Sequence, residues 1–550
     1  MDTHLFSSLN RGELINKLKS TSYDLIVIGG GITGSGIALD AASRGLKTML
    51  IEKKDFASGT SSKSTKLIHG GLRYLKQFEI ALVREVGRER AIVHRLAPQL
   101  VKSEKMLLPM IKDGTFGKVA TSVGLMVYDV LAGVEKADQR KMLSKEETLA
   151  IEPLLDENIL EGGGIYAEYR TDDARLTVEV LKTAVAHGAD AINYVEGSDF
   201  IYDGAKVIGM KCKDRLTDEE FEVSSKYVVS AAGPWVDTLR KKNHSFKGKK
   251  LHLTKGVHIV VPHKRLPVRH SLYFDVPDGR MIFAIPRDKV TYIGTTDTDY
   301  SGDINDVRSN VEDVEYLLDA TNNTFPTVNL TIADVESSWA GLRPLIEEEG
   351  KSASELSRKD EIFLSDTGLI SIAGGKLTGY RKMAERILDL LSEKFEEDYG
   401  IDVAKGKTDE IVISGGPFEG SKEVNKYADE LAKKLGKEGI EPYYGQYLVS
   451  NYGKQSELIV EQMSAYKDKD PLVRLGRAEL WYTVHHEMVH TAMDFFNRRT
   501  GRLYFNLPTI EPLIKPIMKD LKSYFGWKKK RRQQEMEELE KSLKLAANFE

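Results

Sequence analysis

A glycine-rich turn near the N-terminus constrains the fold of this chain more than any other feature. Residues 29–34 read Gly-Gly-Gly-Ile-Thr-Gly and fit the pattern G-x-G-x-x-G. A β-rich run at residues 23–28 precedes the turn, and an alanine-rich stretch at 37–42 indicates a helix after it. Residues 47–51 then have the composition of a second strand. Together they predict a βαβ unit with parallel strands and a right-handed crossover.

The residues of this unit favour a dinucleotide. Gly29, Gly31 and Gly34 have the spacing that allows a tight turn, backbone approach to a pyrophosphate, and close packing of helix on strand. The N-terminus of the helix adds N–H groups and the positive end of its dipole. Glu52 ends the second strand about 20 residues on, where a carboxylate accepts ribose hydroxyls. An acid at that position disfavours a 2′-phosphate, but the choice between NAD and FAD stays open.

Length and composition set limits on the rest of the chain. At 550 residues the chain is too long for one compact core, so two or three domains are expected. Apolar residues make up 41% and charged residues 29%, which is typical of a soluble globular protein. A net charge of -4 gives no overall attraction to nucleic acid, which we do not expect as a partner. The single cysteine, Cys212, excludes an internal disulfide, and its strand-like surroundings predict an inert thiol.

No segment predicts export or a membrane span. The N-terminal residues lack an apolar stretch of signal-peptide length and a cleavage pattern. The longest apolar stretch, residues 123–134, is interrupted by Asp129 and is shorter than the roughly 18 residues of a membrane span. We therefore expect a cytoplasmic protein.

The order of predicted elements indicates an α/β region followed by a helical one. Residues 81–97 predict a long helix, and short strands are expected around 160–169 and 281–298. Two further buried strands, at 226–233 and 369–375, end in small residues and glycine. Beyond about residue 400, periodic helical segments dominate, as at 422–435 and 474–499.

Three motifs in this order resemble one enzyme family. They are GTSSKSTKLIHGGLRY at residues 59–74, AGLRPL at 340–345 and AGGKLT at 373–378. They are similar to those of the FAD-dependent glycerol-3-phosphate dehydrogenases of the aerobic, respiratory type, within the D-amino-acid-oxidase-like flavoproteins. The resemblance extends over nearly the whole chain, including DFFNRRT at 494–500.

The resemblance implies an α/β fold with three parts. These are a doubly wound, Rossmann-like FAD-binding domain, an interleaved β-sheet substrate domain and an all-α C-terminal domain. The implied bounds are an N-terminal arm at 1–22, an oxidoreductase region at 23–400 and a helical domain with a basic tail at 401–550. Within the oxidoreductase region, the FAD-binding segments are about 23–110, 165–250 and 345–400, and the substrate-domain segments are about 111–164 and 251–344.

The resemblance also implies the site residues. FAD, bound non-covalently, would be contacted through Thr60, Ser61, Ser62, Lys66, Leu377 and Thr378, and Gly374 and Gly375 would let the backbone approach the flavin's pyrimidine edge. The implied catalytic residues are His258, Arg343, Lys376, Arg73 and His69. Substrate contacts would come from Arg73, Tyr74, Lys255, His258, Arg343 and Lys376. No metal is implied.

The chemistry of these side chains fits the implied reaction. Arginine forks and lysines hold a phosphate best, and oxidation of a secondary alcohol needs a base for the hydroxyl proton. Whether His258, His69 or a neighbour whose pKa is lowered by the cations takes that proton stays open. The implied activity is oxidation of sn-glycerol 3-phosphate to dihydroxyacetone phosphate, with electrons passed to membrane quinone. The alternatives are an oxidase that uses oxygen and releases peroxide, and a flavoprotein that acts on an amine or imino acid.

Two features near the C-terminus have competing interpretations. Residues 486–490 match the zinc pattern H-E-x-x-H in a helix-prone region, but the matching helix of the family is structural. Residues 514–527 are apolar at helical spacing and precede the basic run Lys528–Arg532. That run is either a solvated end or a contact with anionic lipid, which would make the protein peripheral on the inner face of the cell membrane. The oligomeric state stays open, a homo-oligomer included.

Overall fold

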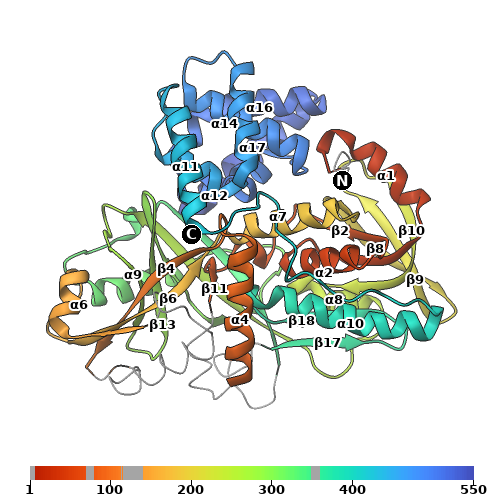
Figure 1. Cartoon of the computed structure of the whole chain (residues 1–550), viewed down its shortest axis with the longest axis horizontal. Coiled ribbons are helices and arrows are strands. Elements are labelled where there is room, and N and C mark those ends of the chain that lie inside the picture. Colours follow the sequence, from red (N-terminus) through yellow and green to blue (C-terminus); the bar gives the residue numbers. More distant parts are fainter. Residues whose placement is uncertain (1–5, 70–79, 113, 115–139, 348–358, 550) are drawn as a thin grey trace.

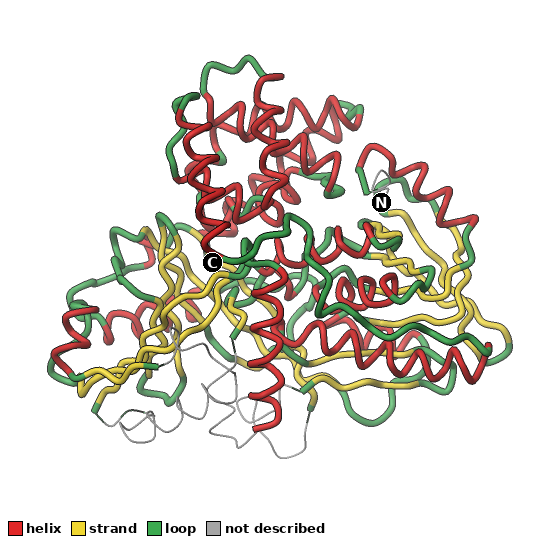
Figure 2. The backbone as a smooth tube through the Cα atoms, in the orientation of Figure 1, coloured by secondary structure: helices red, strands yellow, loops and turns green. Residues whose placement is uncertain are grey.

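The computed structural model describes residues 6–69, 80–112, 114, 140–347 and 359–549. Figure 1 shows a helical body above two bodies built on β-sheets, and Figure 2 shows helices joined by loops, without strands, in the described part of the upper body. Arg73 and Tyr74 lie outside the described residues, as does the whole apolar stretch 123–134. Among the described helices, none has the length and apolar character needed to cross a bilayer.

The first sheet has eight strands and carries the glycine-rich turn. Its central order is β17-β18-β10-β1-β2-β7, and all neighbours in this row are parallel except β17 and β18. Helix α2 (Ile32–Ser43) begins within the glycine-rich segment, after its N-cap Gly31, and packs between α7 (Asp173–Ala186) and α10 (Tyr380–Tyr399). The strands are β1 (Tyr23–Ile28), β2 (Thr48–Ile51), β7 (Asp190–Ile192), β8 (Val195–Asp203), β9 (Lys206–Asp214), β10 (Glu220–Ser230), β17 (Asp360–Leu364) and β18 (Ile370–Gly374).

The second sheet has ten strands and draws on distant parts of the chain. Its main order is β15-β11-β14-β13-β12-β4-β6-β3, with β16 beside β11 and β5 beside β6. Strand β4 pairs with β6 along its whole length, so residues 102–111 belong to this sheet although the implied domain map assigns 23–110 to FAD binding. The strands are β3 (Leu67–Ile68), β4 (Lys102–Ile111), β5 (Lys141–Leu143), β6 (Leu160–Arg170), β11 (Leu251–Pro262), β12 (Ser271–Asp275), β13 (Met281–Arg287), β14 (Val290–Gly294), β15 (Thr298–Asp299) and β16 (Ser337–Ile346).

Helices connect and cover the two sheets. Helix α9 (Val311–Thr324) packs on β11 and β14, with a capping box at its start from Asn310. Helix α4 (Ile80–Leu96) matches the predicted long helix, and a buried ion pair between Glu89 and Arg381 ties it to α10. Shorter helices are α1 (Arg11–Ser20), α6 (Lys145–Ile151) and α8 (Val236–Lys242).

The C-terminal region is helical, as predicted. It comprises α11 (Ser421–Gly436), α12 (Tyr443–Tyr452), α13 (Ser456–Gln462), α14 (Pro471–His486), the π-helical turn η9 (Asp494–Arg499), α15 (Arg502–Phe505), α16 (Glu511–Phe525) and α17 (Lys529–Ala547). The first four of these helices enclose a core of their own around Leu448 and Leu475. Residues 474–499 do not form one helix, because α14 ends at His486 and Met488 has a φ of 55°.

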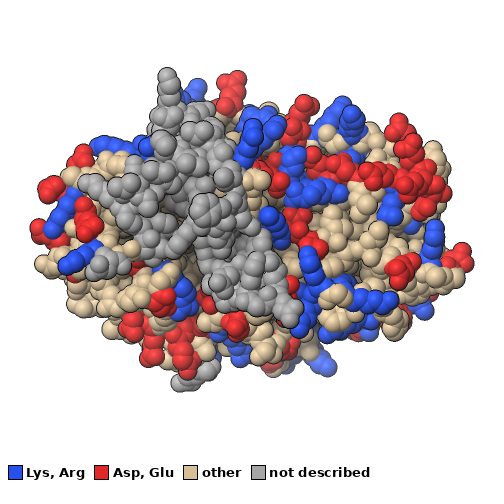
Figure 3. Space-filling model, turned by 90° about the horizontal axis from the view of Figure 1, so that it is seen from below, with Lys and Arg blue, Asp and Glu red and all other residues tan. Residues whose placement is uncertain are grey.

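Charge is mixed on the molecular surface. Seen from below (Figure 3), Lys and Arg side chains alternate with Asp and Glu over the described part of this face. This distribution agrees with the small net charge of -4.

Candidate functional site

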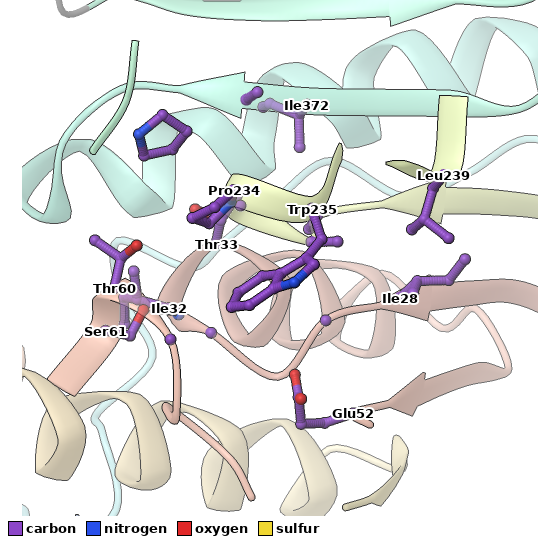
Figure 4. A pocket seen from close by; sticks show the side chains of 18 of the residues that line it. Ile28, Ile32, Thr33, Glu52, Thr60, Ser61, Pro234, Trp235, Leu239 and Ile372 are labelled. Carbon is purple, nitrogen blue, oxygen red and sulfur yellow. Dashed lines mark hydrogen bonds between the residues drawn. The ribbon is translucent and has the colours of Figure 1, made fainter. Parts of the chain in front are cut away.

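A cleft of about 1390 Å³, part of it open to solvent, lies at the carboxyl ends of β1, β2, β10 and β18. This is the edge at which open α/β sheets bind their ligands. Figure 4 shows side chains from several separate segments around it. Its walls are Ile28, Gly29 and Gly31 to Thr33; Ile51 to Lys54 and Ser58 to Ser61; Val195 to Gly197; Ala231 to Trp235; and Pro344 with Ile372 to Leu377.

The glycine-rich turn forms the floor of this cleft. A Cβ atom at Gly34 would lie 1.9 Å from the carbonyl oxygen of Gly29, so only glycine lets the helix start so close to the strand. The backbone N–H of Ile32, at the start of α2, donates to Ser61 Oγ over 2.9 Å. The helix N-terminus therefore faces the cleft, which is the arrangement that binds phosphate groups.

Glu52 stands in the wall at the end of β2. Its Oε2 accepts a hydrogen bond from Gly30 N and its Oε1 accepts one from Lys54 N, each at 2.8 Å. Burial raises the pKa of this carboxyl, while the two N–H donors act in the opposite direction. Figure 4 shows the carboxylate below the ring of Trp235. Glu52, the predicted ribose ligand, thus lines the cleft, and the backbone N–H groups of Gly30 and Lys54 hold its carboxylate.

Trp235 lines the cleft although no motif identified it. Its indole N–H donates to Asn305 Oδ1 over 2.9 Å, and Lys53 Nζ lies 4.5 Å from the ring centroid. The sequence carried one signal for it: the buried strand β10 is followed by small residues and then directly by this aromatic side chain. Such a ring at the edge of a dinucleotide cleft offers a flat apolar surface.

The segment after β2 is only partly as predicted. Thr60 and Ser61 line the cleft, and Thr60 Oγ1 donates to the carbonyl of Leu342 over 2.7 Å. Ser62 and Lys66 are buried behind it. Lys66 Nζ binds Asp173 Oδ1 at 2.5 Å and the carbonyl of Ser62 at 3.1 Å. Lys66 therefore holds the segment in place; neither side chain lines the cleft, and their contact with the cofactor stays a prediction.

The wall opposite the glycine-rich turn comes from the end of β18. Gly374 and Gly375 have φ angles of 79° and 74°, values that favour glycine, and both line the cleft with Lys376 and Leu377. Lys376 Nζ lies 3.5 Å from His69 Nε2. Thr378 does not line the cleft; its hydroxyl donates to the carbonyl of His69 over 3.2 Å. The structure thus brings His69 and Lys376 together at this end.

Arg343 and His258 lie on adjacent antiparallel strands of the second sheet. In the register of β11 and β16, Arg343 is opposite Thr254 and His258 is opposite Trp339, so these side chains share one face. Arg343 donates from Nη1 to Asp297 Oδ1 over 3.0 Å and from Nη2 to Thr295 Oγ1 over 2.9 Å. The next residue, Pro344, lines the cleft, so strand β16 reaches the cleft directly after Arg343.

His258 is a buried imidazole close to two cations. Its ring is 1% exposed and stacks on Trp339 with centroids 4.8 Å apart, and its Nε2 is 3.0 Å from Thr65 Oγ1. Burial, followed by the charges of Arg343 and Lys66, lowers the pKa of this imidazole well below its usual value. A neutral ring of this kind is able to accept a proton at physiological pH.

Lys255 is not brought together with these residues. It lies on the other face of β11, because side chains alternate along a strand and it is three positions from His258. Its Nζ forms an ion pair with Asp313 Oδ2 of α9 at 2.5 Å. Lys255 therefore anchors α9 to the sheet, and its contact with substrate stays a prediction.

The H-E-x-x-H residues do not share a helix. Helix α14 ends at His486, and Glu487 is turned into a buried cluster with Arg175, at 2.7 Å, and Lys182, at 3.1 Å. Although burial alone would raise the pKa of Glu487, these cations hold it well below its usual value. Within the described part of the chain, no group of three or more His, Cys, Asp or Glu side chains is placed to hold a metal ion. Cys212 is buried, and burial raises the pKa of its thiol to about 12.

The apolar residues of 514–527 and the basic run Lys528–Arg532 have different surroundings in the structure. The apolar side of α16 is packed into the core shared with the second sheet, through Leu513, Ile517 and Leu521. The basic run begins α17, with Lys528 to Lys530 exposed. The rest of that helix is packed, since Leu539 is fully buried.

Comparison with known protein families assigns both parts of the chain. Residues 24–381 match the model of the FAD dependent oxidoreductase family. Residues 406–532 match the model described as the C-terminal domain of alpha-glycerophosphate oxidase.

Individual relatives extend this similarity over the full length. The chain is 48% identical over 548 residues to an aerobic glycerol-3-phosphate dehydrogenase of Bacillus subtilis, covering 99% of this chain and 98% of the relative. It is 49% identical over 525 residues to one of Staphylococcus aureus, covering 94% of each. The solved glycerol-3-phosphate dehydrogenase of Bacillus halodurans, complexed with FAD, superposes with a TM-score of 0.85 at 45% identity and covers 99% of both chains.

A more distant structure shares the fold alone. The L-alpha-glycerophosphate oxidase of Mycoplasma pneumoniae gives a TM-score of 0.56 at 18% identity over 70% of this chain. The expected α/β flavoprotein fold with its helical C-terminal domain is confirmed, and so is the resemblance that implied FAD. This chain belongs to the family of FAD-dependent oxidoreductases.

Proposed function

We propose that this protein oxidises sn-glycerol 3-phosphate to dihydroxyacetone phosphate and passes the electrons to a membrane quinone. The proposal rests on two features of the structure, a dinucleotide cleft and a group of cationic and histidine side chains. A dinucleotide cleft includes Lys376 and Pro344 in its lining, and Arg343, which directly precedes Pro344, shares one face of the second sheet with His258. Relatives that share about half of their residues with this chain over nearly its whole length are named aerobic glycerol-3-phosphate dehydrogenases.

The cleft residues fit FAD. The N-terminus of α2 faces the cleft, Gly34 allows close approach of helix and strand, and Glu52 presents a carboxylate in the wall. In the proposed holoenzyme the turn would hold the pyrophosphate and Glu52 the ribose. When bound, FAD supplies a flavin that accepts a hydride equivalent.

The protein's own side chains then have three tasks. Arg343, held in place by Asp297 and Thr295, and Lys376 would bind the substrate phosphate and stabilise negative charge on its oxygen atoms. Neutral His258 would accept the hydroxyl proton as the C2 hydride leaves. His69, 3.5 Å from Lys376, remains a second candidate for that proton. Arg73 and Tyr74, which are also predicted to contact the substrate, lie outside the described residues.

Anaerobic mixing tests the proposal. Glycerol 3-phosphate should bleach the flavin absorbance of the purified protein, and a quinone should restore it. Bleaching by an amine or imino acid, but not by glycerol 3-phosphate, would contradict the proposal. Flavin that remains with the acid-precipitated chain would refute non-covalent binding.

An oxidase is the second candidate, favoured by the name of the family that residues 406–532 match. Reoxidation by oxygen with stoichiometric peroxide, faster than by quinone, would establish it. Electron transfer to a membrane quinone also requires that the protein bind to a membrane. We propose that the exposed residues Lys528 to Lys530 provide this binding by contact with anionic lipid on the inner face of the cell membrane.

A further inference from the structure

The loop that follows β2 has two faces with different surroundings. We call residues 52–61 the cofactor loop, because Glu52, Lys53, Lys54 and Ser58 to Ser61 line the cleft. Between these two lining stretches, Asp55, Phe56 and Ala57 point away and are at most 1% exposed. The middle of the cofactor loop is thus anchored inside the protein while both its ends face the proposed cofactor.

Asp55 is the polar anchor of this loop, and its main partners come from the far end of the chain. Its Oδ1 accepts from Arg499 Nη2 and its Oδ2 from Arg499 Nη1, each at 2.9 Å, which is a bidentate pair. Arg498 Nε also donates to Oδ2. Burial would raise the pKa of Asp55, but Arg499 and Arg498 outweigh it and lower the pKa to about 2. Asp55 is therefore an anion held by two cations of the helical domain.

The two arginines are themselves fixed. Both lie in the π-helical turn η9, where Arg498 Nη2 donates to Asp494 Oδ1 over 2.6 Å. Arg499 Nη2 also donates to the carbonyl of Glu487 over 2.8 Å. Because Arg499 is fully buried and its guanidinium also binds the carbonyl of Glu487, it has little freedom to follow Asp55 if the loop moves.

A second connection runs parallel to the first. Asn193 Nδ2 donates to Asp55 Oδ1 and to the carbonyl of Met488, both at 2.9 Å. Tyr194 donates its backbone N–H to the carbonyl of Lys54 over 2.9 Å and its hydroxyl to Asp494 Oδ1 over 2.7 Å. The cofactor loop, the two residues between β7 and β8, and the chain around η9 therefore form one hydrogen-bonded assembly.

From this geometry we propose that Arg498 and Arg499 are positioning residues for FAD. Acting through Asp55, they hold the cofactor loop in its cleft-lining conformation, so the helical C-terminal domain completes the cofactor site. The proposal rests on FAD occupying the cleft, as proposed above. It does not depend on which substrate the enzyme oxidises.

The test compares two bidentate aspartate–arginine pairs, one fully buried and one partly buried. Asp55→Asn weakens the anchor while keeping its shape. Asp520→Asn is the matched control, because Asp520 forms a bidentate pair with Arg477 at 2.7 and 2.8 Å within the helical domain. Neither Asp520 nor Arg477 lines the cleft. The rate of FAD release is followed by the fluorescence of flavin freed on dilution, and Tm is measured on FAD-depleted protein.

We expect Asp55→Asn to release FAD roughly 5- to 150-fold faster than wild type, the usual range for coupling between linked sites. Asp520→Asn should release FAD within about twofold of wild type, although both variants lower the Tm of the FAD-depleted protein. Equal release rates in the two variants would overturn the proposal, because loss of stability alone would then account for any effect.

If Asp55→Asn does not fold, Arg499→Lys and its control Arg477→Lys decide. Lysine keeps the positive charge but loses the two-pronged contact with the carboxylate. Faster release of FAD from Arg499→Lys than from Arg477→Lys supports the proposal, and equal rates reject it. A failure of the proposed substrate would show in flavin bleaching and leave these release rates unchanged.

Discussion

Replacement of Arg343 is the most direct test of the proposed substrate site. The side chain of Arg343 is 19% exposed, and its guanidinium is oriented by Asp297 and by the hydroxyl of Thr295. If it binds the substrate phosphate, Arg343→Ala removes one partner of a largely desolvated charge pair. That loss costs about 2–5 kcal/mol of transition-state binding.

The expected result is a large fall in kcat/KM. At 1.36 kcal/mol for each factor of ten, the cost corresponds to roughly 30-fold to several thousandfold. Arg343→Lys should recover only part of it, since lysine keeps the charge but loses the fork that matches a phosphate. The assay is reduction of an electron-accepting dye by glycerol 3-phosphate, normalised to bound FAD.

A surface arginine of the same sheet domain provides the control. Arg265 contacts both carboxylate oxygens of Asp334 at 2.6 and 3.1 Å, and its side chain is 40% exposed. Arg265→Ala should leave kcat/KM within about twofold, because exposed ion pairs contribute little. Near-normal kcat/KM in Arg343→Ala that retains its FAD would refute the assignment of Arg343 to the substrate site.

Three further predictions follow from the same structure. Glu52→Ala should weaken FAD binding by about 1.5–3 kcal/mol through loss of a charged acceptor, seen as flavin lost on dialysis, whereas full occupancy would exclude Glu52 as the ribose ligand. The pKa of His258 is lowered, so its imidazole stays neutral until the pH falls below about 6.5, the usual pKa of histidine. If His258 is the base, kcat/KM should fall on the acid side only below that pH. A fall in kcat/KM that begins above about pH 6.5 would reject His258 as the base. Replacing Lys528, Lys529 and Lys530 by Gln should lower binding to anionic vesicles at low salt and leave dye-linked activity unchanged. Adding 0.1 M salt to the wild-type protein should lower vesicle binding in the same way, because it screens charges beyond about 10 Å.

The glycine-rich turn and Glu52 were predictable because their physics is local. The turn needs glycine at fixed positions, the helix starts where the turn ends, and the acid closes the next strand. Each requirement lies within a stretch of about 30 residues, the length of a βαβ unit. The same holds for the strand that ends at Gly374, since its glycines follow the strand directly.

Lys66 and Lys255 show where the sequence could not decide. Both lie in segments that line or adjoin the site, and both are cations of the kind that a phosphate needs. The direction of each side chain depends on a partner far away in the chain: Lys66 forms an ion pair with Asp173 on α7, and Lys255 forms one with Asp313 on α9. A buried lysine is stable only when it is paired, so the partner and not the motif determines where the side chain points.

The H-E-x-x-H segment carries this argument to the C-terminal domain. Its pattern predicts a metal-binding helix, yet the chain leaves the helix at Glu487, whose side chain binds Arg175 and whose carbonyl accepts from Arg499. The segment therefore connects α7 to η9, and through Arg499 to Asp55 behind the cofactor cleft. Because ion pairs of this kind are costly to bury unless every partner is in place, the FAD-binding and helical domains constrain each other's geometry. The helical domain thus stabilises the cofactor cleft without contributing a residue to its lining.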